Sequence, residues 1–242
     1  MKQVLVWDLS TRLFHWLLVV AVLASYFTGE ERGLLFLAHV YTGYVALLLV
    51  LFRLGWGVFG SAHSRFTDFV YSWRKVGSYC AQLLRLKPPR YVGHNPLGGW
   101  MVLALLAVIV AASVTGMFTA SEDGGGGPYA GLIGGEGLYE LHETLGNALI
   151  VLVVVHVLGV VADWILTREN LVAAMITGRK HMDETAASRE PATIPTGRSL
   201  PIVIVVLAIG VYLLVISPPG PLLRTGNQGS SQDTGAEPED RD

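Results

Sequence analysis

Cysteine and charged residues are both scarce in this sequence of 242 residues. It has one cysteine, Cys80, which excludes an intramolecular disulfide, an iron–sulfur cluster, a thiolate zinc site and cofactor attachment through a Cys-x-x-Cys-His motif. Charged residues make up 15% of the chain and hydrophobic residues 52%, a balance far from that of soluble proteins. A water-soluble architecture is therefore excluded, and any bound metal needs ligands other than thiolates.

Long apolar runs take the place of the missing charge. Five of them approach the roughly 20 residues that a helix needs to cross a bilayer, and they cover residues 13–28, 34–52, 100–120, 141–166 and 200–217. The runs are continuous rather than alternating, which favours helices over the strands of a barrel. We predict an all-α integral membrane protein with a four-helix transmembrane bundle and a fifth, C-terminal transmembrane helix.

The basic residues are distributed unevenly between the predicted loops. Fourteen of the 17 lie on the side that contains the N-terminus. They are Lys2, Arg12, Arg53, Arg65, Arg74, Lys75, Arg85, Lys87, Arg90, Arg168, Arg179, Lys180, Arg189 and Arg198. Because basic loops remain in the cytoplasm, we expect a cytoplasmic N-terminus and, after five crossings, a C-terminus on the outer side. The first run lacks a small-residue cleavage pattern, so no cleaved signal peptide is expected.

The chain divides into four predicted parts. Residues 1–181 form the four-helix membrane domain, with a basic inner loop at about 53–99. Residues 182–199 are a cytoplasmic linker, 200–217 the fifth helix and 218–242 an acidic, disordered outer tail. The outer loop over 122–137 is rich in glycine, and we expect it to be mobile.

Local patterns give further expectations within the membrane domain. Phe66, Phe69, Val70 and Trp73 share one helical face, which predicts that the inner loop lies on the membrane surface. Asn95 and the proline after it are typical of a helix start. Four tryptophans are expected in interfacial belts, and they are Trp16, Trp56, Trp100 and Trp164.

Four of the seven histidines fall within the predicted spans, where polar side chains are costly and usually functional. His142 and His156 are 14 residues apart in one helix, which places them about 21 Å apart along its axis and about 40° apart around it. By depth, His142 matches His39 near the outer surface, and His156 matches His15 near the inner surface. The sequence therefore predicts two stacked bis-histidine sites.

Two facing imidazoles suit the axial positions of a haem iron, with the macrocycle between the helices. Gly43 and Gly146 each follow a predicted ligand by one turn, and Gly159 follows His156 by three residues, which leaves room for a flat ring. Without cysteine attachment the haems are b-type. A transporter that uses its histidines to relay protons or metal ions is the alternative. The remaining histidines, in loops, are expected at the solvated surface, and they are His63, His94 and His181.

An ordered series of short motifs resembles the bacterial cytochrome b561 family, and more closely its branch of b-type cytochrome subunits of nickel–iron hydrogenases. The series spans about residues 4–181. It consists of Arg12-Leu13-Phe14-His15-Trp16, His39-x-x-x-Gly43, Arg53-Leu54-Gly55-Trp56-Gly57, Gly60-Ser61-x-x-Ser64-Arg65-Phe66, Gly93-His94-Asn95-Pro96, and His142-x-x-x-Gly146 with His156. The fifth helix and the tail are additions to what resembles a four-helix core.

The resemblance implies two haem b groups, with His39 and His142 as the outer ligands and His15 and His156 as the inner ones. It implies electron transfer, in a bacterial inner membrane, between the quinone pool and a periplasmic redox protein, a hydrogenase-like complex or a cytochrome c. A quinone-coupled oxidoreductase acting on a small molecule such as superoxide remains an alternative, so enzymatic activity is left open. Lipid is an expected partner and nucleic acid is not.

Haem propionates are anionic and favour arginine at the membrane boundary. Arg53 lies at the inner end of the second span, and Arg12 lies one turn before His15. Both are candidates to bind the propionates of the inner haem. We expect no catalytic side chain in the chain, because no nucleophile or base constellation is visible.

Overall fold

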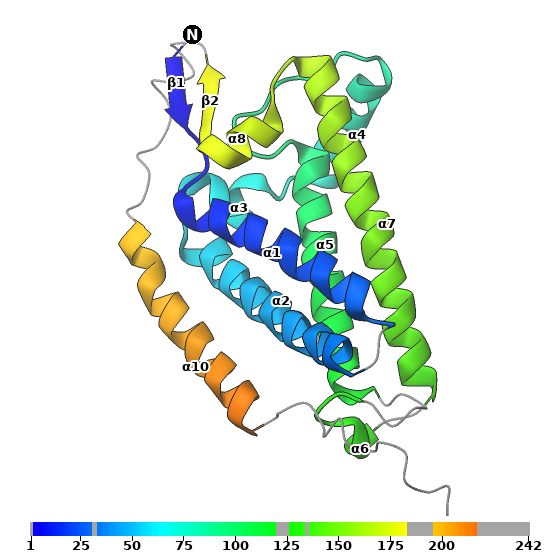
Figure 1. The fold of residues 1–242 in the computed structure, drawn as a ribbon. Coiled ribbons are helices and arrows are strands. Elements are labelled where there is room, and N and C mark those ends of the chain that lie inside the picture. The colour runs from blue at the N-terminus through cyan, green and yellow to red at the C-terminus, as the bar shows by residue number, and fades with distance from the viewer. Residues whose placement is uncertain (1, 31–32, 120–125, 134–135, 183–195, 217–242) are drawn as a thin grey trace, which may run out of the picture.

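Four long apolar helices form the body of the protein (Figure 1). The computed structural model describes residues 2–30, 33–119, 126–133, 136–182 and 196–216. Within them, the helices long enough to cross a membrane are α1 (Leu9–Thr28), α2 (Leu34–Phe59), α5 (Pro96–Phe118) and α7 (Glu136–Thr167). The first four predicted spans are confirmed, although α2 and α7 extend past their predicted ends. The chain is a multi-pass membrane protein with a mostly helical fold.

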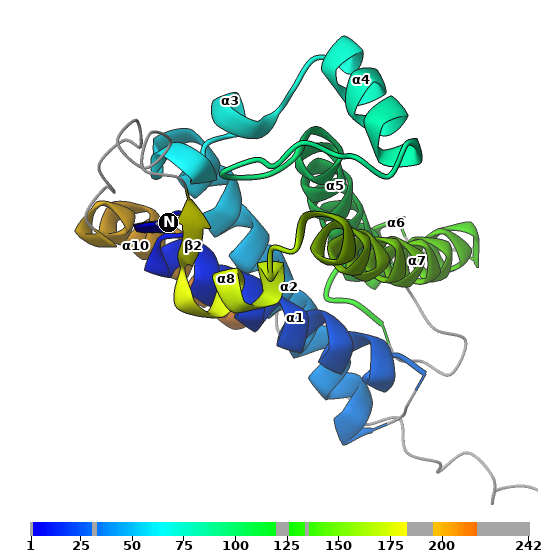
Figure 2. The same cartoon turned by 90° about the horizontal axis from the view of Figure 1, so that it is seen from above.

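The four helices associate as two pairs. The most extensive helix contacts join α1 to α2 and α5 to α7, and α2 also packs on α5 (Figures 1 and 2). Buried apolar side chains from all four helices form one core, in which Val50 and Trp56 are completely inaccessible. Many outward-facing side chains are large and apolar, as is expected where lipid is the solvent.

Polar residues at the helix starts fix where two of the long helices begin. The Asp8 carboxylate accepts a hydrogen bond from the Thr11 backbone N–H at 2.7 Å and caps α1. The Asn95 side chain accepts from the Gly98 N–H at 2.7 Å, and Pro96 is the first residue of α5. The predicted Asn-Pro helix start is therefore confirmed.

A fifth apolar helix, α10 (Leu200–Ile216), lies against the outer side of α2 and follows the 3₁₀ turn η2 (Thr196–Ser199). A Cβ at Gly55 would lie 2.9 Å from Ile202, and a Cβ at Gly210 would lie 2.9 Å from Leu48. Glycine therefore permits the close approach at both places. With 17 residues, α10 is shorter than the four long helices, so its crossing of the membrane stays a prediction.

Short elements gather mainly at the end of the bundle that carries the N-terminus. They are β1 (Lys2–Leu5), η1 (Ala62–Ser64), α3 (Phe66–Phe69), α4 (Trp73–Leu84), α8 (Leu171–Thr177) and β2 (Arg179–Met182), while α6 (Ala130–Ile133) lies at the opposite end. The antiparallel pairing of β1 with β2 departs from the all-α prediction. It forms because the Val6 and Trp7 N–H groups both donate to the Gly178 carbonyl, which brings the N-terminal segment beside the end of α8.

The amphipathic face predicted for the inner loop does not lie wholly on the membrane side. Phe69 is 1% exposed and packs inside the protein rather than toward the membrane. Trp56, expected in an interfacial belt, is 0% exposed and donates from Nε1 to Asp8 at 3.2 Å. The predicted tail, most of the linker, and residues 122–125 and 134–135 of the outer loop lie outside the described residues.

Asp8 is the centre of a buried hydrogen-bond network that connects α1 to the end of α2. Its Oδ2 accepts from the Ser61 hydroxyl, from the Ser64 hydroxyl at 2.7 Å and from the Trp56 indole. Burial by itself would raise the pKa of Asp8, but these hydrogen bonds and the Thr11 N–H outweigh it and hold the pKa below the usual 3.8. The charged carboxylate therefore stabilises the folded protein.

Replacing Asp8 with Asn should lower the free energy of unfolding by about 1–3 kcal/mol, because an amide nitrogen would face hydroxyl and indole donors. Since the folded pKa is depressed, the contribution of Asp8 is complete above pH 3.8 and disappears as the pH falls through the folded pKa. Thermal unfolding in detergent measures both effects. Asp68→Asn is the control, because Asp68 is a partly exposed partner of Arg65. Equal losses in the two variants would contradict the assignment.

Candidate functional site

Two histidines face each other between the helix pairs at the end of the bundle remote from the N-terminus. His39 lies on the second turn of α2, and His142 lies on the second turn of α7. Their ring centroids are 5.9 Å apart and their planes are 86° apart. This spacing is close to that of two imidazoles that share one metal ion through bonds of about 2 Å. The predicted outer pair is thus brought together in space.

Each of these rings is fixed by the neighbouring helix of its own pair. His39 Nδ1 lies 2.8 Å from the Ser25 carbonyl oxygen of α1, and His142 Nδ1 lies 2.9 Å from the Ala112 carbonyl oxygen of α5. With a proton on Nδ1, each ring donates to that carbonyl. Nε2 is then the atom that can bind a metal. This arrangement is typical of histidines that ligate metals.

Glycines shape the surroundings of both rings. A Cβ at Gly116 would lie 2.7 Å from His142 Cε1, and a Cβ at Gly29 would lie 3.3 Å from His39 Nδ1, so both glycines allow a ring to approach a helix. Gly43 and Gly146 differ, because a Cβ at either would meet no heavy atom within 4 Å. The backbone beside these two residues is therefore accessible to a flat group.

The second predicted pair lies nearer the N-terminal end of the bundle. His15 is in the second turn of α1, and His156 is in the second half of α7. The two rings are close enough to interact electrostatically. His15 Nδ1 is buried and has no hydrogen-bond partner among the described residues. A buried ring nitrogen without a partner is costly unless it binds something, so His15 fits a ligand role.

Arg53, in the last two turns of α2, is almost completely buried, at 2% exposed. Its guanidinium carbon lies 5.1 Å from the Phe66 ring centroid and 5.6 Å from that of Phe69. Nη1 is buried and has no hydrogen-bond partner among the described residues. A buried guanidinium with an unused donor suits an anionic group.

Arg12, the other predicted anion ligand, has a partner. Its Nη1 donates to the Ile176 carbonyl oxygen at 2.7 Å and so connects α1 to the last turn of α8. Its Nε is buried and has no partner among the described residues. Arg12 therefore makes a hydrogen bond between helices, whereas the contacts described for Arg53 are with aromatic rings.

His94 is a functional candidate that sequence reasoning assigned wrongly to the solvated surface. Its ring packs against Trp7 at 4.7 Å and Phe69 at 4.5 Å between centroids, and its Nδ1 is buried without a partner among the described residues. Burial, followed by the positive charges of Arg53 and Lys180, lowers the pKa of His94 to about 3. Its position in the motif Gly93-His94-Asn95-Pro96, directly before a helix cap, was the available signal.

An open cleft of about 620 Å³ lies beside His94. Its lining includes the basic or phenolic side chains of His63, Arg65, Tyr71, Arg90 and Tyr91, together with the acidic Asp68. His63, predicted at the solvated surface, is thus part of a cleft wall, whereas His181 is exposed as predicted. The cleft lies at the basic end of the protein, between the segment that begins at Ala62 and the one that ends at His94.

Asp163 is a second polar residue that sequence reasoning missed. This buried carboxylate lies two turns after His156 in α7 and accepts from the Tyr79 hydroxyl at 3.1 Å and the Asn95 amide at 3.2 Å. Burial, followed by the nearby charge of Asp163, raises the pKa of Tyr79, which keeps the phenol a donor. The network fastens α4 and the start of α5 to α7. The sequence feature that could have identified Asp163 was a single acidic residue within an apolar run.

The donor set limits the chemistry that this chain can support. Among the described residues, no group of three or more His, Cys, Asp and Glu side chains is placed to hold a metal ion. The available ligands are opposed pairs of imidazoles with apolar surroundings. Such pairs fit the two axial positions of a haem, whose other four ligands come from the macrocycle.

Comparison with known proteins gives a consistent result. A family model described as prokaryotic cytochrome b561 matches residues 6–178. The chain is 28% identical to the probable Ni/Fe-hydrogenase B-type cytochrome subunit of Azotobacter vinelandii, with 72% of this chain and 87% of the relative covered. It is 23% identical to that of Rhizobium leguminosarum bv. viciae, with 74% and 89% covered. No solved structure matches the chain significantly.

His94 should make the protein less stable in mild acid. The usual pKa is 6.5 and the folded value is about 3, so between these values the unfolded chain binds a proton that the folded protein does not. The free energy of unfolding should therefore fall by up to about 1.4 kcal/mol for each pH unit below 6.5.

The variant His94→Gln should flatten this dependence when chemical denaturation is followed from pH 7 to pH 4. His181→Gln is the control, because His181 is exposed. An unchanged pH profile in His94→Gln would contradict the placement of His94.

Proposed function

The chain belongs to the prokaryotic cytochrome b561 family, and on that premise we propose that it holds two haem b groups and transfers electrons across the inner membrane. The proposed routes join the quinone pool to a redox partner at the periplasmic face. One observation carries the proposal. His39 and His142 come from two different helix pairs, and their ring centroids lie 5.9 Å apart. The family and the relatives establish that the chain is a b-type cytochrome.

In the proposal, His39 and His142 ligate the outer haem through Nε2. The carbonyls of Ser25 and Ala112 support this role, because they fix the Nδ1 proton and the direction of each ring. Gly43 and Gly146, one turn after the ligands, leave the helix backbone open to the macrocycle. The same helices therefore supply both the ligands and the space.

His15 and His156 are the proposed ligands of the inner haem. The unpartnered Nδ1 of His15 and the electrostatic proximity of the two rings support this assignment. Bound haem b would supply one-electron redox chemistry, while the apolar helices exclude water and set the local dielectric. The protein thus needs no nucleophile or catalytic base.

Arg53 is the proposed partner of an inner haem propionate, because its buried Nη1 has a donor to spare. Arg12 is a weaker candidate for the same role, since its Nη1 already binds the Ile176 carbonyl. The cleft beside His94 is the proposed approach for a quinone headgroup to the inner site.

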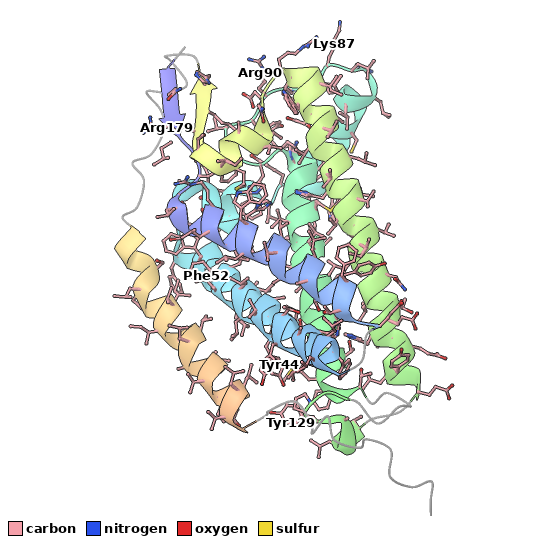
Figure 3. All side chains as sticks on the ribbon, viewed as in Figure 1. Tyr44, Phe52, Lys87, Arg90, Tyr129 and Arg179 are labelled. Carbon is pink, nitrogen blue, oxygen red and sulfur yellow. The ribbon has the colours of Figure 1, made fainter. Side chains whose placement is uncertain are left out.

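The orientation is proposed from charge. Lys87, Arg90 and Arg179 lie at the end of the bundle that carries the N-terminus (Figure 3), and basic ends remain in the cytoplasm. His39 and His142 then lie near the periplasm. The relatives are named as subunits of Ni/Fe-hydrogenases, so a hydrogenase-like complex is the proposed class of periplasmic partner.

The purified chain should contain two haem b per polypeptide, as counted by the pyridine haemochrome method. His142→Ala should reduce the count to one, because the outer haem loses a ligand while the inner pair is unchanged. Gly137→Ala, in the same helix with no heavy atom within 4 Å of the added Cβ, is the matched control.

A count of zero in the unaltered protein would refute the haem proposal and favour a histidine-based transporter. Two haems in the His142→Ala variant would refute the pairing. Quinol oxidation coupled to superoxide turnover by the isolated chain would favour the small-molecule oxidoreductase.

Arg53→Gln should lower the midpoint potential of the inner haem, because it removes a buried positive charge that would favour the reduced state if Arg53 bound a propionate of that haem. Redox titration of the reduced-minus-oxidised spectrum measures the shift. Arg65→Gln is the control, since Arg65 is partly exposed and paired with Asp68 at 2.9 Å. If both haems keep their occupancy and potential in Arg53→Gln, the propionate assignment is wrong.

A further inference from the structure

Helix α4 carries an exposed apolar strip that its contacts within the protein leave uncovered. Val76 and Tyr79 are buried and attach the helix to the bundle. Trp73 and Leu84, which are 68% and 85% exposed, lie 11 residues apart and therefore on one side of the helix. Leu86, in the turn that follows, is 69% exposed. We call Trp73, Leu84 and Leu86 the apolar strip.

The strip is bordered by positive charge. Residues 65–96 contain six basic residues and one acidic residue, and that acid, Asp68, pairs with Arg65. Arg74, Arg85 and Lys87 are exposed beside the strip. Such a combination of large apolar side chains and basic groups is typical of helices that lie in a membrane interface.

The position of α4 places the strip at the membrane boundary. Trp73 stacks on Trp100, in the first turns of α5, with 4.2 Å between ring centroids, and Trp100 Nε1 donates to the Tyr71 carbonyl at 3.0 Å. The Trp73 end of the strip therefore lies at the level where α5 enters the apolar part of the bundle. Seen from above, α4 lies outside α5, away from α1 and α2 (Figure 2).

We propose that α4 and the turn after it bind anionic phospholipid at the membrane surface on the basic side of the protein. Trp73, Leu84 and Leu86 enter the boundary between headgroups and acyl chains. Arg74, Arg85 and Lys87 contact lipid phosphates, which combine negative charge with several acceptor oxygens. The inference needs only that the four long helices span a membrane, so it is independent of the haem proposal.

Charge complementarity selects lipid as the occupant. A soluble protein that covered the strip would have to be acidic and also reach the level of Trp100, where lipid already surrounds α5. Phospholipid with a net negative charge satisfies both conditions. The positive residues favour it over zwitterionic lipid, at about fivefold in local enrichment for each basic residue close to the surface.

The lone cysteine makes the placement measurable in the full-length protein. Cys80, one helix turn before Leu84, is partly exposed on the strip side of α4, and it can carry a fluorophore. In vesicles containing phosphatidylglycerol, brominated acyl chains should quench this label and aqueous acrylamide should not. The same label at Ser78→Cys in a Cys80→Ala background should respond in the opposite way, because Ser78 is exposed on the other side of the helix.

Lipid preference is tested without the label. Native mass spectrometry of protein taken from equal mixtures of phosphatidylglycerol and phosphatidylcholine should show retained phosphatidylglycerol. The double variant Arg85→Gln, Lys87→Gln should reduce that preference at least fivefold, whereas Arg179→Gln, at the same end but on β2, should not. Acrylamide quenching of the Cys80 label equal to that at Ser78→Cys, or no phosphatidylglycerol preference in the unaltered protein, would overturn the proposal.

Discussion

A ring N–H of an imidazole within hydrocarbon needs an acceptor, and at His39 and His142 the bundle supplies one from the backbone carbonyl of a neighbouring helix. Ser25 of α1 accepts from His39 of α2, and Ala112 of α5 accepts from His142 of α7. Each helix pair thus orients one ring through a hydrogen bond within that pair. The facing of the rings depends on the packing of α2 on α5, which sets the distance between the pairs. A single type of hydrogen bond therefore links helix pairing to ligand geometry.

The N-terminal end of the bundle is held by a different kind of interaction. Two buried carboxylates accept hydrogen bonds from neutral donors: Asp8 from a tryptophan and two serines, and Asp163 from Tyr79 and Asn95. All of these donors are uncharged, although the charge of Asp8 also acts on the buried Arg53 guanidinium. Arg53, by contrast, remains buried with a donor unused. The local structure satisfies its acids and leaves a cation available for an anionic group.

Spacing within one helix was sufficient to predict the two levels of histidine, because a helix converts 14 residues into a fixed rise and rotation. The four long helices were predictable for a similar reason, since their length follows from the bilayer. The hydrogen bonds of His39 and His142 were not predictable, because Ser25 and Ala112 are brought near only by tertiary packing. Sequence reasoning misjudged His94 and Trp56 because it inferred burial from position relative to the spans. Short turns fold back over the end of the bundle, where they bury Trp56 and cover most of the His94 ring.

Two glycines, one on α2 and one on α10, determine how the fifth helix attaches to the bundle. Gly55 and Gly210 let α10 approach α2 from outside, where neither histidine pair lies. Ile202, Val203 and Val206 of α10 pack against the core of the long helices, and the Ser10 hydroxyl of α1 donates to that of Ser199, directly before α10, at 3.4 Å. Because α10 covers one side of that core, its removal would expose apolar side chains of α2 to the surroundings.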